Sequence, residues 1–251
     1  MPSWLLAGLW GLFAASSLLL GAALGFYLRI PQRVVGVVMG FGSGVLISAL
    51  SFELMEEAHE RGGSLATAVG FAIGAVIFTG ANWLLARFGA AERKKSGQEQ
   101  PSEHEVEGSG TAIAVGTLVD AIPESIVIGL SFLEGGAIGL IAIAAIFLAN
   151  LPEGLSSAAG MKKAGRSARY VFTLWGGIVL VSGISAAAGY AGMRDFPLPV
   201  IAATSAVAAG AILAMLVDTM IPEAVKFTGS ATGIIAVIGF LLAFLLSKLN
   251  G

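Results

Sequence analysis

Two polar motifs interrupt apolar stretches of this sequence and carry groups that could bind a cation. Within residues 117–126, Asp120 and Glu124 are four positions apart, and further along Asn150 and Glu153 are three positions apart. In a helix, each spacing places both side chains on one face. An ionised carboxyl at mid-membrane costs about 2.5–3.5 kcal/mol on insertion scales, so each acid needs a compensating partner.

The surrounding spans supply no obvious partner for these acids. The predicted spans carry no Lys, Arg or His in their central parts. The carboxyls are therefore either protonated or neutralised by something from solution. A divalent cation would neutralise them directly, because hard cations prefer oxygen ligands.

Proline lies immediately before each of the two glutamates. Pro123 and Pro152 have no N–H to donate, so we expect both helices to be broken there, freeing the carbonyls of Val119 and Leu148 as extra ligands. Such irregular backbone is tolerated in a membrane only beside protein or a hydrated cavity. Small residues are dense around the motifs, and we expect them to bring the two helices close together.

Further acids lie in other apolar stretches and suggest a pathway. Asp218 could line an inner exit, and Glu223, which follows a proline, either continues that exit or marks a helix end near the interface. Glu53 and Glu57 form either an entry funnel or an interfacial cluster.

Composition excludes a soluble domain. Of 251 residues, 56% are hydrophobic and 12% are charged, and the mean hydropathy is +0.88, whereas soluble domains carry about 25% charged residues. The absence of cysteine excludes disulfides and thiolate metal sites. A net charge of -2 gives no reason to expect nucleic acid as a partner.

The apolar runs predict an all-α integral membrane protein, residues 1–251 forming one domain with eight transmembrane helices. An apolar run of about 20 residues is long enough to cross a bilayer. The expected spans are 4–28, 34–57, 65–88, 111–133, 136–160, 168–192, 198–222 and 230–248. Residues 89–110 are polar and are expected to form a mobile cytoplasmic loop between spans three and four. A metal-sensing role for this loop would depend on the single His104.

Basic residues predict the orientation. Eleven Lys and Arg residues lie in or beside the loops after spans one, three, five and seven, whereas Arg61, Arg194 and Lys248 lie on the other side. Basic loops face the cytoplasm. We therefore expect loops 1–2, 3–4, 5–6 and 7–8 inside, both termini outside, and the first span retained rather than cleaved as a signal peptide.

Internal similarities suggest an inverted repeat of the form 3+2+3. Residues 44–58 in span two align weakly with residues 210–224 in span seven, and these spans run in opposite directions. Residues 122–125 and 151–154 repeat Pro-Glu in the antiparallel spans four and five. Inverted repeats are common in secondary transporters, although apolar helices can also resemble each other by chance.

These features together resemble the Zrt/Irt-like (ZIP) family of divalent metal transporters over nearly the whole chain. That family carries His-Asn-x-Pro-Glu/Asp-Gly in span four and His/Gln-x-x-Pro-Glu-Gly in span five. Here Asp120 and Ala121 replace the His-Asn pair and Ala149 replaces the His/Gln, while Glu124 and Glu153 match the family's acids. The Glu-Pro pair of span six is missing, so the acid that bridges two metals is absent.

The resemblance implies transport of zinc, iron, manganese or a similar ion. We expect one oxygen-only metal site rather than two, with a preference for harder cations. Its ligands would be Asp120, Glu124, Asn150 and Glu153, with Glu53, Glu57, Asp218 and Glu223 as pathway residues. The expected partners are the metal ion, the lipid of the cell membrane and, by analogy, a second copy in a homodimer. No permanently bound cofactor is expected.

Two other functions were weighed against transport. A transport-inactive sensor or scaffold is the alternative, because the family's histidines are lost. An intramembrane enzyme is not expected, because such sites usually use a His ligand or a Ser/His/Lys nucleophile system, and no intramembrane His exists here.

Overall fold

The computed structural model describes residues 1–133 and 137–249, apart from the side chains of residues 137–142 and 249, and this part of the chain contains helices and no strand. The elements are α1 (Ser3–Tyr27), α2 (Gln32–Ala49), the π-helix η1 (Leu50–Met55), α3 (Glu56–Ala86), η2 (Ala90–Glu92), α4 (Ser109–Ser131), α5 (Ala137–Lys163), α6 (Ala168–Met193), α7 (Leu198–Met215), the π-helix η3 (Leu216–Met220), α8 (Ile221–Thr228), η4 (Gly229–Ala231) and α9 (Thr232–Leu249). The prediction of an all-helical chain is confirmed.

Several helical runs are long and apolar enough to cross a membrane. Within the described residues, five runs meet this condition: Ser3–Tyr27, Gln32–Ala86, Ser109–Ser131, Ala168–Met193 and Leu198–Lys248. Large apolar side chains such as Val76, Leu180 and Ile234 are exposed on the outside of the bundle. An apolar exterior of this kind is compatible with a membrane protein.

Glycines in the left-handed region turn the chain within the two longest runs. Gly63 has φ 75° and ψ 165° inside the run that continues from α2 into α3, between the predicted spans 34–57 and 65–88. Gly229 has φ 56° between α8 and α9. L-residues with a side chain rarely adopt such angles. The boundary between the predicted spans 111–133 and 136–160 lies outside the described residues.

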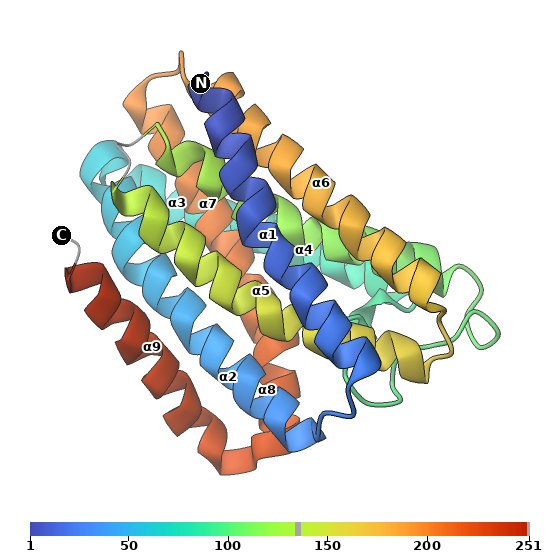
Figure 1. The fold of residues 1–251 in the computed structure, drawn as a ribbon. Helices are drawn as coiled ribbons and strands as arrows, with labels where there is room; N and C mark the ends of the chain where they lie inside the picture. The colour runs from blue at the N-terminus through green and yellow to red at the C-terminus, as the bar shows by residue number, and fades with distance from the viewer. Residues whose placement is uncertain (134–136, 250–251) are drawn as a thin grey trace.

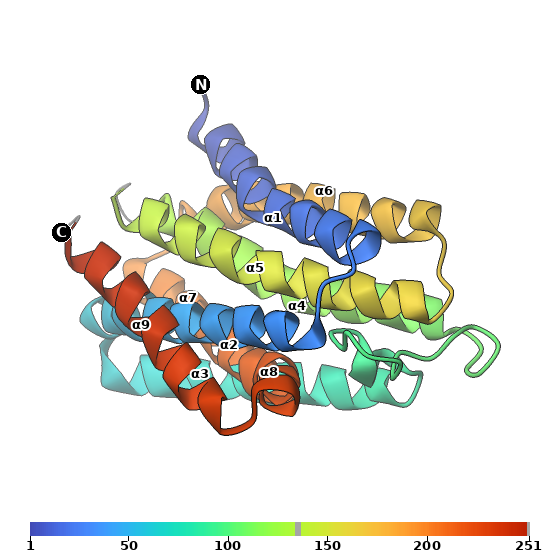
Figure 2. The same cartoon turned by 60° about the horizontal axis from the view of Figure 1, so that its bottom comes forward.

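The helices pack in a regular set of pairs (Figures 1 and 2). α1 packs on α5 and α6, α2 on α5 and α9, α3 on α7, and α4 on α6 and α7. Glycine permits the closest of these contacts: a Cβ added at Gly44 of α2 would collide with the carbonyl of Ala236 in α9, and one at Gly210 of α7 with that of Phe71 in α3. Without these Cβ atoms, the helix backbones can approach closely.

The expected breaks in spans four and five are not present. α4 and α5 each run through their proline, Pro123 and Pro152, as one continuous helix. Proline removes a single backbone hydrogen bond, and the remaining bonds of each helix are enough to continue it. The departures from α-helical geometry lie instead in η1 and η3, which follow α2 and α7.

The glycines near the motifs serve different neighbours from those expected. Gly129 faces Ala186 of α6, Gly154 faces Leu18 of α1, and Gly116 and Gly160 face residues of the 89–110 segment. The expectation that these small residues mainly bring α4 and α5 together is therefore wrong, because α1, α6 and the segment are the partners that lie against them.

The two ends of the bundle differ. The start of α1 and the end of α9 lie at one end, and the 89–110 segment lies at the opposite end, where α1 also meets α2 (Figures 1 and 2).

Candidate cation site

The four predicted ligands lie on two helices and are all buried. Asp120 and Glu124 come from α4, and Asn150 and Glu153 from α5; each is less than 5% exposed. Asp120 and Glu153 approach one common cation, the ammonium of Lys94, whose Nζ lies 3.4 Å from Asp120 Oδ2 and 2.9 Å from Glu153 Oε2. The structure therefore brings these two predicted residues to one point.

A second cation, Arg93, binds Asp120 through both ends of its guanidinium. Arg93 Nε donates to Asp120 Oδ2 at 2.7 Å, and Nη2 donates to Oδ1 at 2.6 Å. Its Nη1 donates to Asn82 Oδ1 at 2.7 Å and to the carbonyl of Ala90 at 3.0 Å. This two-point contact matches the planar guanidinium to the carboxylate and is among the stronger polar interactions in proteins.

Both cations belong to the 89–110 segment, whose polar composition predicts a mobile loop. In the structure Arg93 and Lys94 are 1% and 2% exposed, so this part of the segment is buried in the bundle. The assumption that compensating charge must come from solution is corrected by this finding. The polar composition of the segment predicts exposure to solvent. Arg93 and Lys94 are buried all the same, because they pair with buried acids whose charge would be costly without a partner.

Backbone contacts fix the segment against α5. Gln100 Nε2 donates to the carbonyls of Arg93, Lys95 and Ser157 at 2.9–3.0 Å. Ser156 Oγ donates to the carbonyl of Lys94 at 2.5 Å. A Cβ at Gly160 would collide with the carbonyl of Lys95, so glycine there allows the segment to approach the helix.

The other two predicted ligands have few partners. Glu124 Oε1 is buried and accepts no hydrogen bond from any described residue. Asn150 Nδ2 donates to the carbonyl of Ala14 over a long distance, 3.4 Å. A buried carboxyl without a donor is unusual in proteins and marks a group with unused ligand capacity.

The acids are not arranged around a vacant metal position. Among the residues that the structure describes, no group of three or more His, Cys, Asp or Glu side chains is gathered closely enough to hold a metal ion. The position between Asp120 and Glu153 is taken by Lys94. With Arg93 and Lys94 in place, the predicted ligand set is therefore not formed in this arrangement.

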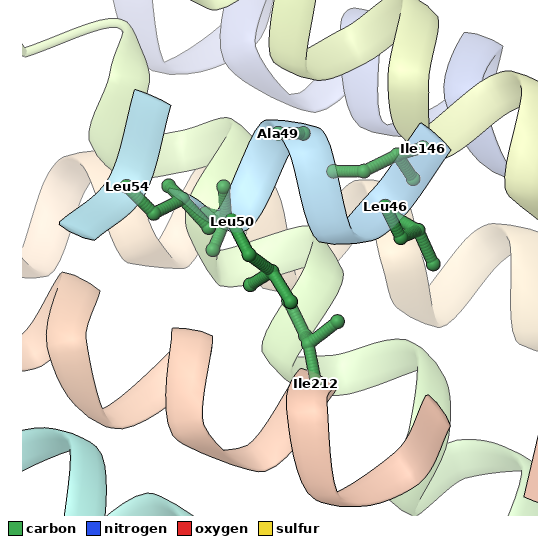
Figure 3. Close-up of a pocket in the computed structure, with 7 residues that line it drawn as sticks. Leu46, Ala49, Leu50, Leu54, Ile146 and Ile212 are labelled. Atoms are coloured by element: carbon green, nitrogen blue, oxygen red, sulfur yellow. The ribbon is translucent and has the colours of Figure 1, made fainter. Parts of the chain in front are cut away.

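An apolar layer lies about one helical turn from Glu124 and Asn150, and Figure 3 shows residues of this layer. Val127 lies about one turn after Glu124 and Ile146 about one turn before Asn150, and with Leu46, Ala49, Leu50, Leu54 and Ile212 they line a small cavity. The cavity measures ≈ 10 Å³, which is at the lower limit of about 10–15 Å³ for one water. Leu54, in this layer, directly follows Glu53 in the chain.

The four predicted pathway residues are divided between the two ends. Glu53, in η1, accepts a 2.7 Å hydrogen bond from Ser247, and Glu57 forms a 2.6 Å ion pair with Arg61. Asp218 is exposed in η3. The structure does not bring Glu53 or Glu57 to the buried acids.

Glu223 is fully buried and holds the same segment as the central acids. Its Oε1 accepts from both the backbone N–H and the hydroxyl of Ser96 at 2.6 Å, and Lys95 Nζ lies 3.8 Å from Oε2. A glutamate at a helix end near the membrane interface would be expected to be exposed, whereas Glu223 is buried under the segment. Residues 93–96 thus connect Asp120, Glu153 and Glu223.

The far end of the segment is fixed by Glu103. Hydrogen bonds from the Arg166 guanidinium and the backbone N–H groups of Gly110 and Gly108 lower the pKa of Glu103 to about 2. Because this carboxylate is ionised at neutral pH, it holds the start of α4 beside Arg166.

Sequence reasoning missed Arg93, Lys94, Ser96 and Gln100. The run of basic residues at 93–95 was treated only as an orientation signal, yet it is the nearest group of cations in the chain to the α4 motif. No protein-family model matches the chain, and no curated protein matches it significantly. The interpretation of the site therefore depends on its own geometry.

Proposed function

We propose that this protein carries divalent metal cations across a membrane and binds them at Asp120, Glu124, Asn150 and Glu153. One observation carries the proposal: of three buried carboxyls on two apolar helices, Asp120 and Glu153 are paired with cations of a connecting segment rather than of the helices themselves, and Glu124 has no cationic partner among the described residues. A connecting segment can withdraw without unfolding the bundle.

Charge balance supports replacement of the two tethered cations by one metal ion. Arg93 and Lys94 together contribute two positive charges, the same as one divalent cation. Withdrawal of the segment with entry of a metal ion would leave the net charge among Asp120, Glu124 and Glu153 unchanged. Because uncompensated buried charge is costly, such an exchange is much cheaper than emptying the site.

The helix pairings support an inverted repeat of eight spans. In such a repeat, α1, α2 and α3 correspond to α6, α7 and α9, and α4 corresponds to α5. The contact between α2 and α9 then corresponds to that between α7 and α3, and the contact between α1 and α5 to that between α6 and α4. All four of these helix–helix contacts are present in the structure. In transporters, such symmetry allows a central site to open alternately to either side.

The π-helical segments fit the same correspondence. In the alignment of residues 44–58 with 210–224, Leu50 matches Leu216, and these two residues begin η1 and η3. The proposal therefore treats the similarity of spans two and seven as a repeat rather than as chance. π-helical turns are often found at functional sites.

The remaining parts of the proposal follow from sequence. The chain resembles ZIP transporters, and its basic loops favour a cell-membrane orientation with both termini outside. A homodimer is proposed by analogy alone. Because all four ligands offer oxygen, manganese, magnesium or iron should be preferred to copper, and zinc remains a candidate because it also binds carboxylates.

In the proposed mechanism, the present arrangement is closed on both sides. The apolar layer closes the route from Glu53, and residues 93–96 close the route toward Glu223. A transported ion would enter past Glu53 and Glu57 when the layer parts, and leave toward Asp218 and Glu223 when the segment withdraws.

A metal sensor or scaffold without transport is a second candidate. The observation that favours it is the pair of buried contacts, Arg93 with Asp120 and Lys94 with Glu153, which give the acids a structural role that needs no metal.

Uptake into proteoliposomes separates the two candidates. Wild type, Glu124→Ala/Glu153→Ala and the control Glu60→Ala, which changes an exposed acid, would be given manganese, iron, zinc, cadmium or magnesium. If the protein is a carrier, wild type and the control will take up metal ions, and the double variant will lose this uptake. If no ion enters with correctly folded wild-type protein, the carrier is excluded and the scaffold is favoured.

A further inference from the structure

A basic cavity lies at the end of the bundle that carries the 89–110 segment, outside the proposed cation site. Its volume is ≈ 510 Å³. It is lined by Gly25, Leu28, Arg29, Ile30, Pro31, Gln32, Val35, Ser96, Ala159, Lys162 and Lys163. Three of these residues are cationic, and none of the described lining residues is acidic, so the cavity favours an anion.

The three cations retain hydrogen-bond donors for a ligand. Lys162 Nζ donates to the carbonyl of Phe26 at 2.5 Å, and Lys163 Nζ donates to the carbonyl of Ser96 at 2.8 Å. An ammonium group has three N–H donors, so each lysine has two left. Arg29 is exposed, and no described residue forms an ion pair or hydrogen bond with its guanidinium.

The start of α2 contributes to the same cavity. Pro31, which immediately precedes α2, and Gln32, its first residue, are among the lining residues, and no side chain caps this helix end. Unpaired N–H groups and the positive end of the helix dipole attract phosphate and similar anions. Together with the three cations, they make the cavity suited to a phosphate group.

The rest of the lining indicates what the phosphate is attached to. Leu28, Ile30, Val35 and Ala159 give the cavity an apolar wall beside its basic residues. The exposed Tyr27, next to this wall, stacks on Phe172 with ring centroids 5.6 Å apart. Tyrosine is enriched where a membrane meets water. A ligand that is anionic at one end and apolar at the other fits this lining better than a free ion.

We propose that this cavity binds the phosphate headgroup of an anionic membrane phospholipid. Arg29, Lys162 and Lys163 contact the phosphate, and the apolar wall contacts the start of the acyl chains. Basic pockets between helices at a membrane surface bind anionic lipids by this combination of contacts. Because Lys163 also holds Ser96, the bound lipid lies next to the segment that covers Glu223.

Native mass spectrometry of the full chain in neutral detergent tests the proposal. Purified protein would be mixed with phosphatidylglycerol, phosphatidylcholine or inorganic phosphate, and the number of molecules retained per chain would be counted. We expect one tightly retained phosphatidylglycerol, and no comparable retention of phosphatidylcholine. A basic residue near the surface is worth about fivefold in lipid affinity, so Arg29→Gln/Lys163→Gln should weaken retention about 30-fold.

The matched control removes the same charge from the same end of the bundle. Arg33→Gln/Arg169→Gln changes two exposed arginines that do not line the cavity, and it should retain the lipid as wild type does. The single variant Arg29→Gln, which removes no hydrogen bond or ion pair among the described residues, should lower retention about fivefold.

Three outcomes would overturn the proposal. Equal weakening by the control would show that general surface charge, not this cavity, binds the lipid. Equal retention of phosphatidylcholine would exclude recognition of the anionic headgroup, and displacement of the lipid by inorganic phosphate would assign the cavity to a free ion. None of these outcomes depends on metal transport.

Discussion

Arg93 and Asp120 form the most completely buried ion pair described in the protein. Both side chains are 1% exposed, and two charge-assisted hydrogen bonds connect them. A pair of this kind adds little net stability compared with apolar residues, but removing one partner leaves a buried charge uncompensated. The pair therefore makes the position of the segment depend on the charge of Asp120.

Neutralising Asp120 should therefore destabilise the protein strongly. We expect Asp120→Asn to lower the free energy of unfolding by about 3–5 kcal/mol, because Arg93 would remain buried beside a neutral amide. Denaturant unfolding in detergent, followed by the fluorescence of the buried Trp175, would measure the change.

The control is Asp195→Asn, at an exposed ion pair with Arg194. It should change the free energy of unfolding by no more than about 0.5 kcal/mol. Equal stability of the two variants would mean that the Arg93–Asp120 contact contributes nothing to holding the segment.

The central acids could be predicted from the sequence, whereas their partners could not. Asp120, Glu124 and Glu153 are recognisable because charged residues are rare and costly in apolar helices. Arg93 and Lys94 precede Asp120 by more than 25 residues, in a segment whose composition is that of a solvated loop. Their docking depends on specific distant contacts, such as those of Gln100 and Gly160, which no local pattern reveals.

At the scale of elements, the position of residues 93–100 depends on a close approach to α5. The carbonyl of Lys95 and the side chain of Gln100 both lie where a Cβ of residue 160 would be. By contrast, a Cβ at Gly176 of α6 would meet no atom within 4 Å. These two glycines give a matched pair of helical positions, one beneath the segment and one on an open face.

Gly160→Ala should release the segment, whereas Gly176→Ala should not. We expect trypsin to cleave after Lys94 and Lys95 at least tenfold faster in Gly160→Ala, because the added methyl group collides with backbone that cannot move within the packed segment. Mass spectrometry would quantify these cleavages relative to cleavage after the exposed Arg87. Unchanged cleavage in Gly160→Ala would contradict the described seating of the segment.

The elements themselves were predicted unevenly. Hydropathy located the helices well, because an apolar run of about 20 residues is a strong signal. Proline was a poor guide: α4 and α5 continue through Pro123 and Pro152, and the π-helical segments η1 and η3 follow α2 and α7 instead. A π-helical turn has no comparable residue signature, so its position could not be predicted from sequence.

At the scale of the whole molecule, the two ends of the bundle have different roles. One end is closed by apolar packing around Leu50 and Ile212, and the other by polar contacts of the segment with Glu153 and Glu223. Under the proposed function, only the polar closure would respond directly to a cation, because a metal ion would compete with Lys94 and Arg93 for the same carboxylates. The central claim is that metal and segment exclude each other.

Tryptic cleavage of the full chain with and without metal tests this claim most directly. Manganese should increase cleavage after Lys94 and Lys95 in wild type, measured against cleavage after Arg87, and should have little effect in Glu124→Gln/Glu153→Gln. These changes remove metal ligands while leaving the Arg93–Asp120 contact in place. If saturating manganese, magnesium, iron and zinc all leave cleavage unchanged or reduce it, metal and segment do not compete, and the account of the site is wrong.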